Sequence, residues 1–177
     1  MKINKNIAIV TGITLVGALF MMRNKISGAV WDLVSEHRIK KLHPKIQNKV
    51  RTFINKAEKE GIQLRVTDGL RSFKEQDALY AKGRTTPGKI VTNAKAGQSY
   101  HNYGLAIDVV PMINGKPNYK DDYIKIARIG KSLGFTWGGD FRSFTDKPHF
   151  HANFGFSIAA LQQKILNNQV QNGYVTV

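Results

Sequence analysis

The chain contains no cysteine among its 177 residues. Disulfide bonds and thiolate metal sites are therefore excluded, although this absence fits a reducing and an oxidising compartment equally well. Acidic residues are also scarce, since 12 Asp and Glu stand against 27 Lys and Arg, which gives a net charge of +15. An excess of this size favours polyanionic surroundings.

Nucleic acid is the first polyanion that such a charge suggests. However, the chain carries no recognisable nucleic-acid-binding motif, and its basic residues are scattered instead of being interleaved with aromatic residues on one stripe. We therefore expect no nucleic-acid partner. An anionic polymer or an anionic membrane face would explain the charge as well.

An uncharged apolar run opens the chain. Residues 7–22 carry no charge and are preceded by Lys2 and followed by Arg23. The run predicts an N-terminal signal or membrane anchor over residues 1–26, either uncleaved or slowly cleaved. Because basic residues flank both ends, the positive-inside rule does not fix its orientation. Residues 27–41 are expected to connect it to the rest.

The remaining length is enough for one domain with its own core. We place this domain at residues 42–156 and a C-terminal helix with a loose polar tail at 157–177. Apolar residues spaced at helical intervals after Pro44 predict an amphipathic helix that ends at Gly61. Alternation over residues 62–67 predicts a half-buried strand. The expected fold is α+β, with a small, mainly antiparallel sheet, helices packed on one side of it and the functional site at the exposed face.

A histidine and a carboxylate lie at the mouth of a second predicted strand, over residues 105–110. Side chains alternate along a strand, so Asp108 points away from the main apolar row. Gly104 allows a sharp turn before the strand, which swings His101 back over the strand end. Pro111 is expected to close the strand.

A second cluster follows, in which Asp146 stands three residues before His149 and His151 comes two residues later. A catalytic zinc ion takes three nitrogen or oxygen ligands and keeps a fourth position for water. Three such ligands are available in His101, Asp108 and His149. Because side chains alternate along a strand, His149 and His151 face the same side, and this alternation alone does not choose between them. Asp146 is the candidate general base that moves a proton from water to a leaving amine. The pattern predicts a zinc hydrolase with one ion.

Arg71 follows a predicted turn and precedes a predicted helix. Ser72 and Glu75 form a capping-box pattern for a helix that runs to about Lys82. Arg71 therefore lies beside a helix N-terminus, where an anion or an oxyanion is favoured. Residues 83–99 predict a long loop, which we interpret as a wall of the substrate cleft.

These motifs resemble those of a known family. The resemblance is to the M15 group of zinc peptidases, which includes D-alanyl-D-alanine carboxypeptidases, D,D-dipeptidases and the L-alanyl-D-glutamate endopeptidases of bacterial cell-wall enzymes and phage endolysins. It covers residues 37–154, and the stretch 79–88 is most similar to the endopeptidase branch. The motifs that carry it are Ser99-x-His101-x-x-Gly104-x-Ala106-x-Asp108 and Asp146-x-x-His149.

The resemblance implies a role for each matching residue. It implies zinc bound by His101, Asp108 and His149, with Asp146 as general base and acid and Arg71 holding the substrate carbonyl or the oxyanion. The implied reaction is hydrolysis of the peptidoglycan stem peptide between L-alanine and D-glutamate. The implied location is the cell envelope, where the protein would be membrane-anchored or secreted and would also meet anionic wall polymers.

Two rival functions and several residue roles stay open at this point. The rivals are a carboxypeptidase that releases terminal D-alanine and a wall-binding module of the same fold that does not cut. Ser99 and Tyr103 are candidates for substrate contact or for support of a ligand. His151 has these two possible roles and a third, as an ordinary core residue. Asp68 and Leu70 depart from the usual family pattern before the arginine.

Overall fold

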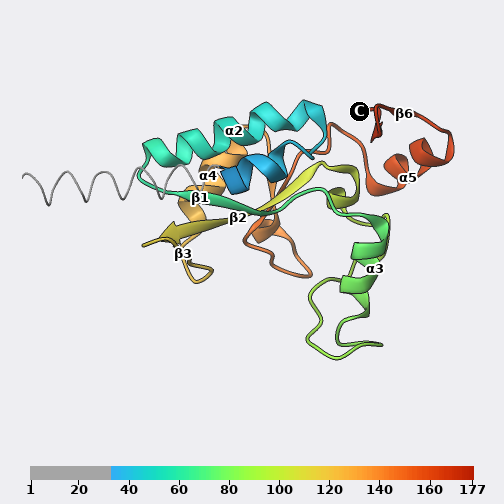
Figure 1. Ribbon diagram of the computed structural model, residues 1–177, viewed down its shortest axis with the longest axis horizontal. Coiled ribbons are helices and arrows are strands. Elements are labelled where there is room, and N and C mark those ends of the chain that lie inside the picture. Colours follow the sequence, from blue (N-terminus) through green and yellow to red (C-terminus); the bar gives the residue numbers. More distant parts are fainter. Residues whose placement is uncertain (1–32) are drawn as a thin grey trace, which may run out of the picture.

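The computed structural model describes residues 33–177 (Figure 1). The predicted N-terminal anchor lies outside this range. Within the described range, no helix combines the length and apolar character needed to span a membrane. In chain order the elements are α2 (Pro44–Lys59), β1 (Leu64–Asp68), α3 (Phe73–Ala81), η1 (Tyr100–Tyr103), β2 (Ala106–Ile113), β3 (Lys116–Pro117), α4 (Ile124–Ser132), β4 (Thr136–Trp137), η2 (Gly138–Asp140), β5 (His149–His151), α5 (Ile158–Leu166), β6 (Val170–Gln171) and β7 (Tyr174–Val175).

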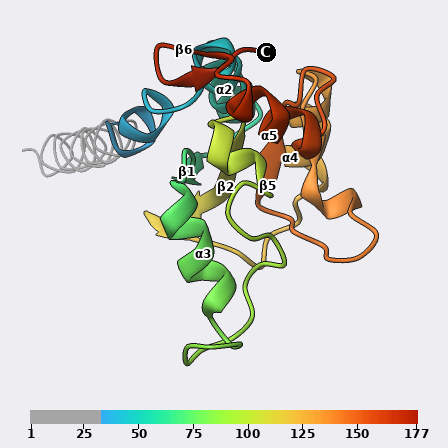
Figure 2. The ribbon, with the colours of Figure 1, turned by 90° about the vertical axis from the view of Figure 1, so that its right-hand side faces the viewer.

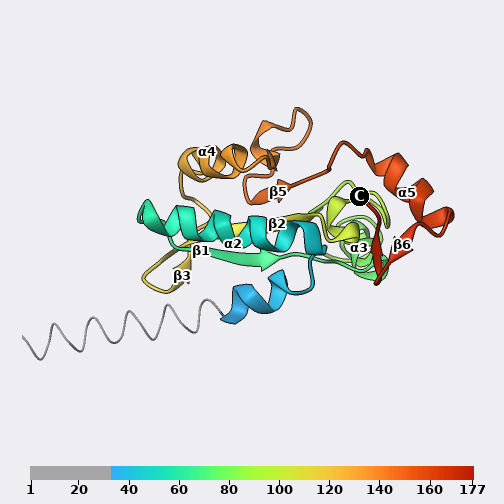
Figure 3. The same cartoon turned by 90° about the horizontal axis from the view of Figure 1, so that it is seen from above.

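A small antiparallel sheet forms the centre of the fold, as expected for the α+β class. Its strands follow the order β1-β2-β5-β4, and β3 pairs with the far end of β2. Helices α2 and α4 lie together over one face (Figures 1 and 3). The ring of Phe53 on α2 meets Phe150 on β5 with 4.9 Å between centroids, and Phe150 is fully buried. The hydrophobic core therefore lies between these helices and the sheet.

Helix α2 forms for the reasons that its sequence predicts. Pro44 begins the helix, where its missing N–H costs nothing, and the side chain of His43 accepts a hydrogen bond from the Lys45 amide. Gly61 follows the helix with a φ of 78°, a left-handed conformation that favours glycine. The buried face consists of Ile46, Val50, Phe53, Ile54 and Ala57.

Strand β2 is longer than predicted, because Pro111 lies inside it and does not end it. The Pro111 carbonyl accepts a hydrogen bond from the Asn118 amide. In a strand, the N–H and C=O groups of one residue point to the same side, so the missing N–H of Pro111 faces away from β1 and leaves the β1–β2 ladder intact. The strand can thus continue to Ile113 and turn into β3.

Helix α3 and the long loop after it stand away from the sheet (Figure 2). The predicted capping box is present, since the Ser72 hydroxyl accepts from the Glu75 amide and the Glu75 carboxylate accepts from the Ser72 amide. Gln76 is the one residue of this helix that is buried. The expectation of helices packed on one face holds for α2 and α4, whereas α3 builds a separate wall.

The C-terminal tail is ordered, so the prediction of a loose tail is wrong. Strands β6 and β7 form a hairpin, and Val175 is 3% exposed in the core. The His43 ring lies 3.0 Å from the Val175 carbonyl through Nε2, and the Tyr174 hydroxyl donates to the Lys41 carbonyl. These long-range contacts anchor a polar segment whose sequence shows no strong strand pattern.

Candidate active site

Two neighbouring strands bring the carboxylate and the second histidine together. Asp108 on β2 pairs directly with His149 on β5, while His151 lies opposite Ala106. Ile107 and Phe150 point into the core, so the predicted alternation is confirmed and Asp108, His149 and His151 share the opposite face. The pairing register places His149 closer to Asp108 than His151, because directly opposed residues are the closest across a sheet.

The short helix η1 delivers the first histidine to the same place. Ser99 caps this helix, and its hydroxyl accepts from the His101 amide. Gly104 then turns the chain at a φ of 66°, and a Cβ there would lie 2.8 Å from the backbone nitrogen of His43. The turn needs glycine, and it places His101 over the end of β2 as expected.

The three donor atoms form a compact triangle. His101 Nε2 lies 3.2 Å from His149 Nδ1, and Asp108 Oδ1 lies 3.3 and 3.4 Å from these two nitrogens. Ligands of a tetrahedral zinc ion at 2.0–2.1 Å would be separated by about 3.3 Å. Asp108 Oδ1 is buried and, among the described residues, has no hydrogen-bond partner of acceptable geometry. The donor set therefore fits a zinc ion.

Electrostatic attraction within this triangle favours the charged forms of Asp108 and His101. Burial alone would raise the pKa of Asp108, but the nearby His101 and His149 outweigh it and hold that pKa far below its usual range. Burial would likewise lower the pKa of His101, yet Asp108 raises it overall. The carboxylate is thus ionised at neutral pH and available as a metal ligand.

Asp146 lies at the edge of the same cleft and is half-buried. Its amide donates to the Gly138 carbonyl, and its carbonyl accepts from the His149 amide, so the loop is tied to η2 and to β5. Burial, followed by the negative charge of Asp108, raises the pKa of the Asp146 carboxyl. A raised pKa makes this carboxylate a stronger base than an exposed aspartate.

Arg71 is held in the cleft by two side chains. Its Nη1 donates to Gln76 Oε1 at 2.8 Å, and its Nε and Nη2 donate to Asp68 Oδ2. Gln76 is fully buried and also donates to the Ala94 carbonyl at 2.7 Å. Gln76 was not predicted as a site residue from the sequence, although a glutamine on a helix five residues after a cleft arginine was a usable signal. Gln76 connects Arg71 to the long loop.

His151 is buried beside the triangle. Its Nδ1 lies 3.1 Å from His149 Nε2, and its ring stacks on Tyr100 with centroids 4.3 Å apart. Burial, followed by the nearby His149 and His101, lowers the pKa of His151 to about 3. The ring is therefore neutral at physiological pH.

The other candidates separate into cleft and core residues. Ser99 lines the cleft. Tyr103 lies beneath it, 3% exposed, where its hydroxyl donates to the Gly97 carbonyl at 2.8 Å and its ring meets Phe73. Tyr103 thus steadies the segment that leads to His101.

The cleft has a volume of about 630 Å³. One wall comes from the long loop and the other from the loop before Asp146. Exposed apolar and aromatic side chains on these walls include Val91, Phe141 and Phe144, and Tyr119 adds a further one from the segment between β3 and α4.

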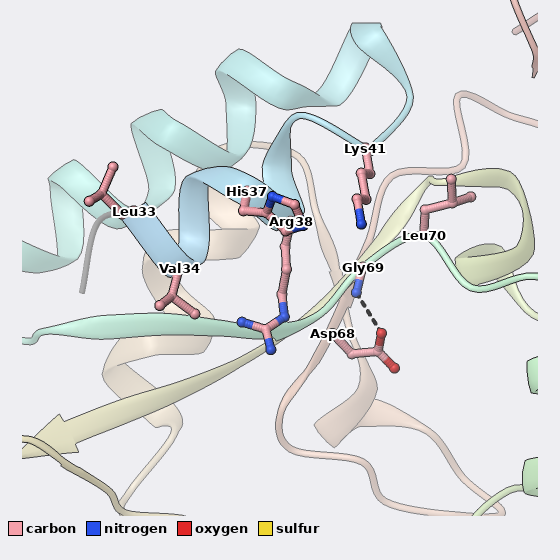
Figure 4. Close-up of a pocket in the computed structure, with 8 residues that line it drawn as sticks. All are labelled: Leu33, Val34, His37, Arg38, Lys41, Asp68, Gly69 and Leu70. Carbon is pink, nitrogen blue, oxygen red and sulfur yellow. Dashed lines mark hydrogen bonds between the residues drawn. The ribbon is translucent and has the colours of Figure 1, made fainter. Parts of the chain in front are cut away.

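A second cavity of about 590 Å³ lies behind the end of β1, between that strand and residues 33–41 (Figure 4). It shares Asp68 with the cleft of the candidate site, but its other lining residues are basic or apolar, apart from His37. The group of His101, Asp108 and His149 is not part of it. We therefore assign the candidate site to the first cleft.

Comparisons with known proteins point to a family of peptidases. A model of M15 peptidases described as D-alanyl-D-alanine carboxypeptidase matches residues 92–152. The peptidoglycan L-alanyl-D-glutamate endopeptidase CwlK of Bacillus subtilis is 44% identical over 119 residues, which cover 61% of this chain and 71% of CwlK.

A phage protein and a solved structure are also similar. The L-alanyl-D-glutamate peptidase of Listeria phage A118 is 31% identical over 121 residues, and the match covers 66% of this chain but only 40% of the phage protein. The crystal structure of the Serratia marcescens L-Ala D-Glu endopeptidase ChiX matches with a TM-score of 0.52 and 27% identity. That match covers 68% of this chain and 87% of ChiX.

Proposed function

The chain belongs to the M15 peptidase family, and from this premise we propose that it hydrolyses the peptidoglycan stem peptide between L-alanine and D-glutamate with one zinc ion. The observation that carries hydrolysis is the triangle of His101, Asp108 and His149 with Asp146 at its rim. The choice of bond rests on the similarity to CwlK and ChiX, whose names state that cleavage.

Each residue has a distinct part in the proposed reaction. His101, Asp108 and His149 would hold zinc, which, when bound, polarises the scissile carbonyl and makes water more acidic. Asp146 takes a proton from the attacking water as its oxygen bonds to the carbonyl carbon. Arg71 donates hydrogen bonds to the oxygen on which negative charge develops. Asp146 then gives its proton to the leaving nitrogen as the C–N bond breaks.

The position of Asp146 at the rim of the cleft suits both halves of this cycle. A carboxylate held there can accept a proton from water and keep it until the amine leaves. Arg71 enters the reaction already oriented by Asp68 and Gln76, so little reorganisation is needed as charge develops. The aromatic walls of the cleft would exclude water from the scissile bond.

Mass spectrometry of muropeptides incubated with the full chain tests this proposal. We expect products with a new N-terminal D-glutamate, lost with a chelator, restored by zinc and absent for Asp146→Ala. Removal of terminal D-alanine alone would instead indicate the carboxypeptidase activity named by the matching family model. Zinc binding without any cleavage would indicate a wall-binding module.

We also propose that the protein acts in the cell envelope, because its proposed substrate lies there. Residues 1–26 would anchor or export it, and the net charge of +15 would favour contact with anionic wall polymers. Protease treatment of intact cells should degrade the domain if this is correct. Complete protection in intact cells, with degradation after lysis, would contradict it.

A further inference from the structure

The two histidines of the triangle are held by different kinds of partner. His101 Nδ1 lies 2.7 Å from the Gly69 carbonyl oxygen. A carbonyl oxygen only accepts, so this nitrogen carries a hydrogen and the lone pair of Nε2 faces the triangle. Backbone therefore fixes the tautomer of the first histidine.

The tautomer of His149 depends on a side chain instead of a backbone carbonyl. Its Nδ1 faces His101 Nε2 and Asp108 Oδ1, so this nitrogen must offer its lone pair if it is to bind a cation. The hydrogen then lies on Nε2, which needs an acceptor. The atom in position is His151 Nδ1, at 3.1 Å.

We propose that His151 is a positioning residue of the metal centre, because its Nδ1 accepts the Nε2–H of His149 and thereby holds the Nδ1 lone pair of His149 toward the ion. A metal-binding histidine typically donates its other N–H to such a partner, which fixes both tautomer and ring orientation. The inference rests on the proposed metal centre but not on which peptide bond is cleaved.

The surroundings of His151 fix its own ring. Tyr100 stacks on it at an interplanar angle of 11°, and the Tyr100 hydroxyl donates to the Phe156 carbonyl at 3.0 Å. Only 5% of His151 is exposed. The acceptor atom is therefore held in place, as a positioning role requires.

Two substitutions of His151 test the hydrogen-bond acceptor and the stacked ring separately. His151→Phe keeps a flat ring to stack on Tyr100 but removes the acceptor. His151→Asn removes the ring but can place its Oδ1 near the position of the imidazole Nδ1, where it can accept. His37→Phe is the matched control, because His37 is exposed and lies outside the cleft.

The test measures zinc affinity of the full chain by competition with a chelator, with thermal unfolding of the metal-free variants as the check on folding. We expect His151→Phe to weaken zinc binding about 10- to 100-fold, His151→Asn to recover most of the loss and His37→Phe to leave the affinity unchanged. Nitrogen NMR of the zinc-loaded native protein should show His149 protonated on Nε2, a readout that stands even if a variant fails to fold.

Three results would overturn the inference: native zinc affinity in folded His151→Phe, no recovery in His151→Asn, or His149 protonated on Nδ1. Normal zinc binding with no cleavage of stem peptides would overturn the proposed function alone. A native chain that binds no divalent metal would overturn both.

Discussion

Gln76 offers the sharpest test of how the cleft is assembled. It is fully buried and makes two strong hydrogen bonds, accepting from Arg71 Nη1 at 2.8 Å and donating to the Ala94 carbonyl at 2.7 Å. Gln76→Met keeps a side chain of similar length but removes both bonds. The substitution therefore separates polar connection from packing.

The expected loss can be worked out from these contacts. A hydrogen bond to a charged group contributes about 1.5–3 kcal/mol, and a buried group left unpaired costs about 1–3 kcal/mol. Because Ala94 is half-buried and not fully buried, we assign its carbonyl the lower part of this cost and expect the free energy of unfolding to fall by about 2–4 kcal/mol. Arg71 keeps its bonds to Asp68, so we expect kcat to fall about 10- to 100-fold through misplacement.

Urea unfolding and steady-state cleavage of a stem peptide measure the two effects. Gln76→Glu is the informative partner variant, since it still accepts from Arg71 but opposes the Ala94 carbonyl. It should lose stability while keeping kcat close to native. Gln163→Met, on the exposed face of α5, is the matched control and should change stability by less than about 0.5 kcal/mol. If the free energy of unfolding of Gln76→Met lies within about 0.5 kcal/mol of the native value, the Gln76 hydrogen bonds do not stabilise the fold as expected.

Three further changes have defined outcomes. Burial lowers the pKa of His43, so as the pH falls the unfolded chain binds a proton on this ring before the folded chain does, and the free energy of unfolding should fall below about pH 6.5. Urea unfolding should show a smaller fall in His43→Asn, and an equal fall would contradict the role of His43. The raised pKa of Asp146 means that its ionised form destabilises the metal-free fold. In the presence of a chelator, Asp146→Asn should therefore raise the melting temperature at pH 7 but not below about pH 4, where the native carboxyl is protonated in both states. The same substitution should lower activity about 10²- to 10⁴-fold. Gly138→Ala would put a Cβ 2.4 Å from the Asp146 carbonyl oxygen and should reduce kcat about 100-fold, whereas native kcat would show that the loop tolerates the shift.

The order of the secondary structure could be predicted because it depends on local patterns. The apolar spacing of α2, the capping box at Ser72 and the alternation along β2 each act over a few residues. The predictions fail where distant contacts intervene. Strand β2 continues through Pro111 because its missing N–H faces away from β1, and the tail is ordered because His43 and Tyr174 bind it to the N-terminal side of the domain.

The sequence by itself determined which kinds of side chain are available for the site, namely two histidines and a carboxylate in a chain without thiols. The alternation of side chains along the strand also predicted that Asp108 points away from the core. This alternation has a period of two and could not distinguish His149 from His151. Only the tertiary structure gives them different neighbours, because the β2–β5 register places His149 directly opposite Asp108 and His151 opposite Ala106. The Gly69 carbonyl at His101 and Gln76 at Arg71 came from the tertiary structure too, since pairing between distant segments leaves no periodic trace in the chain.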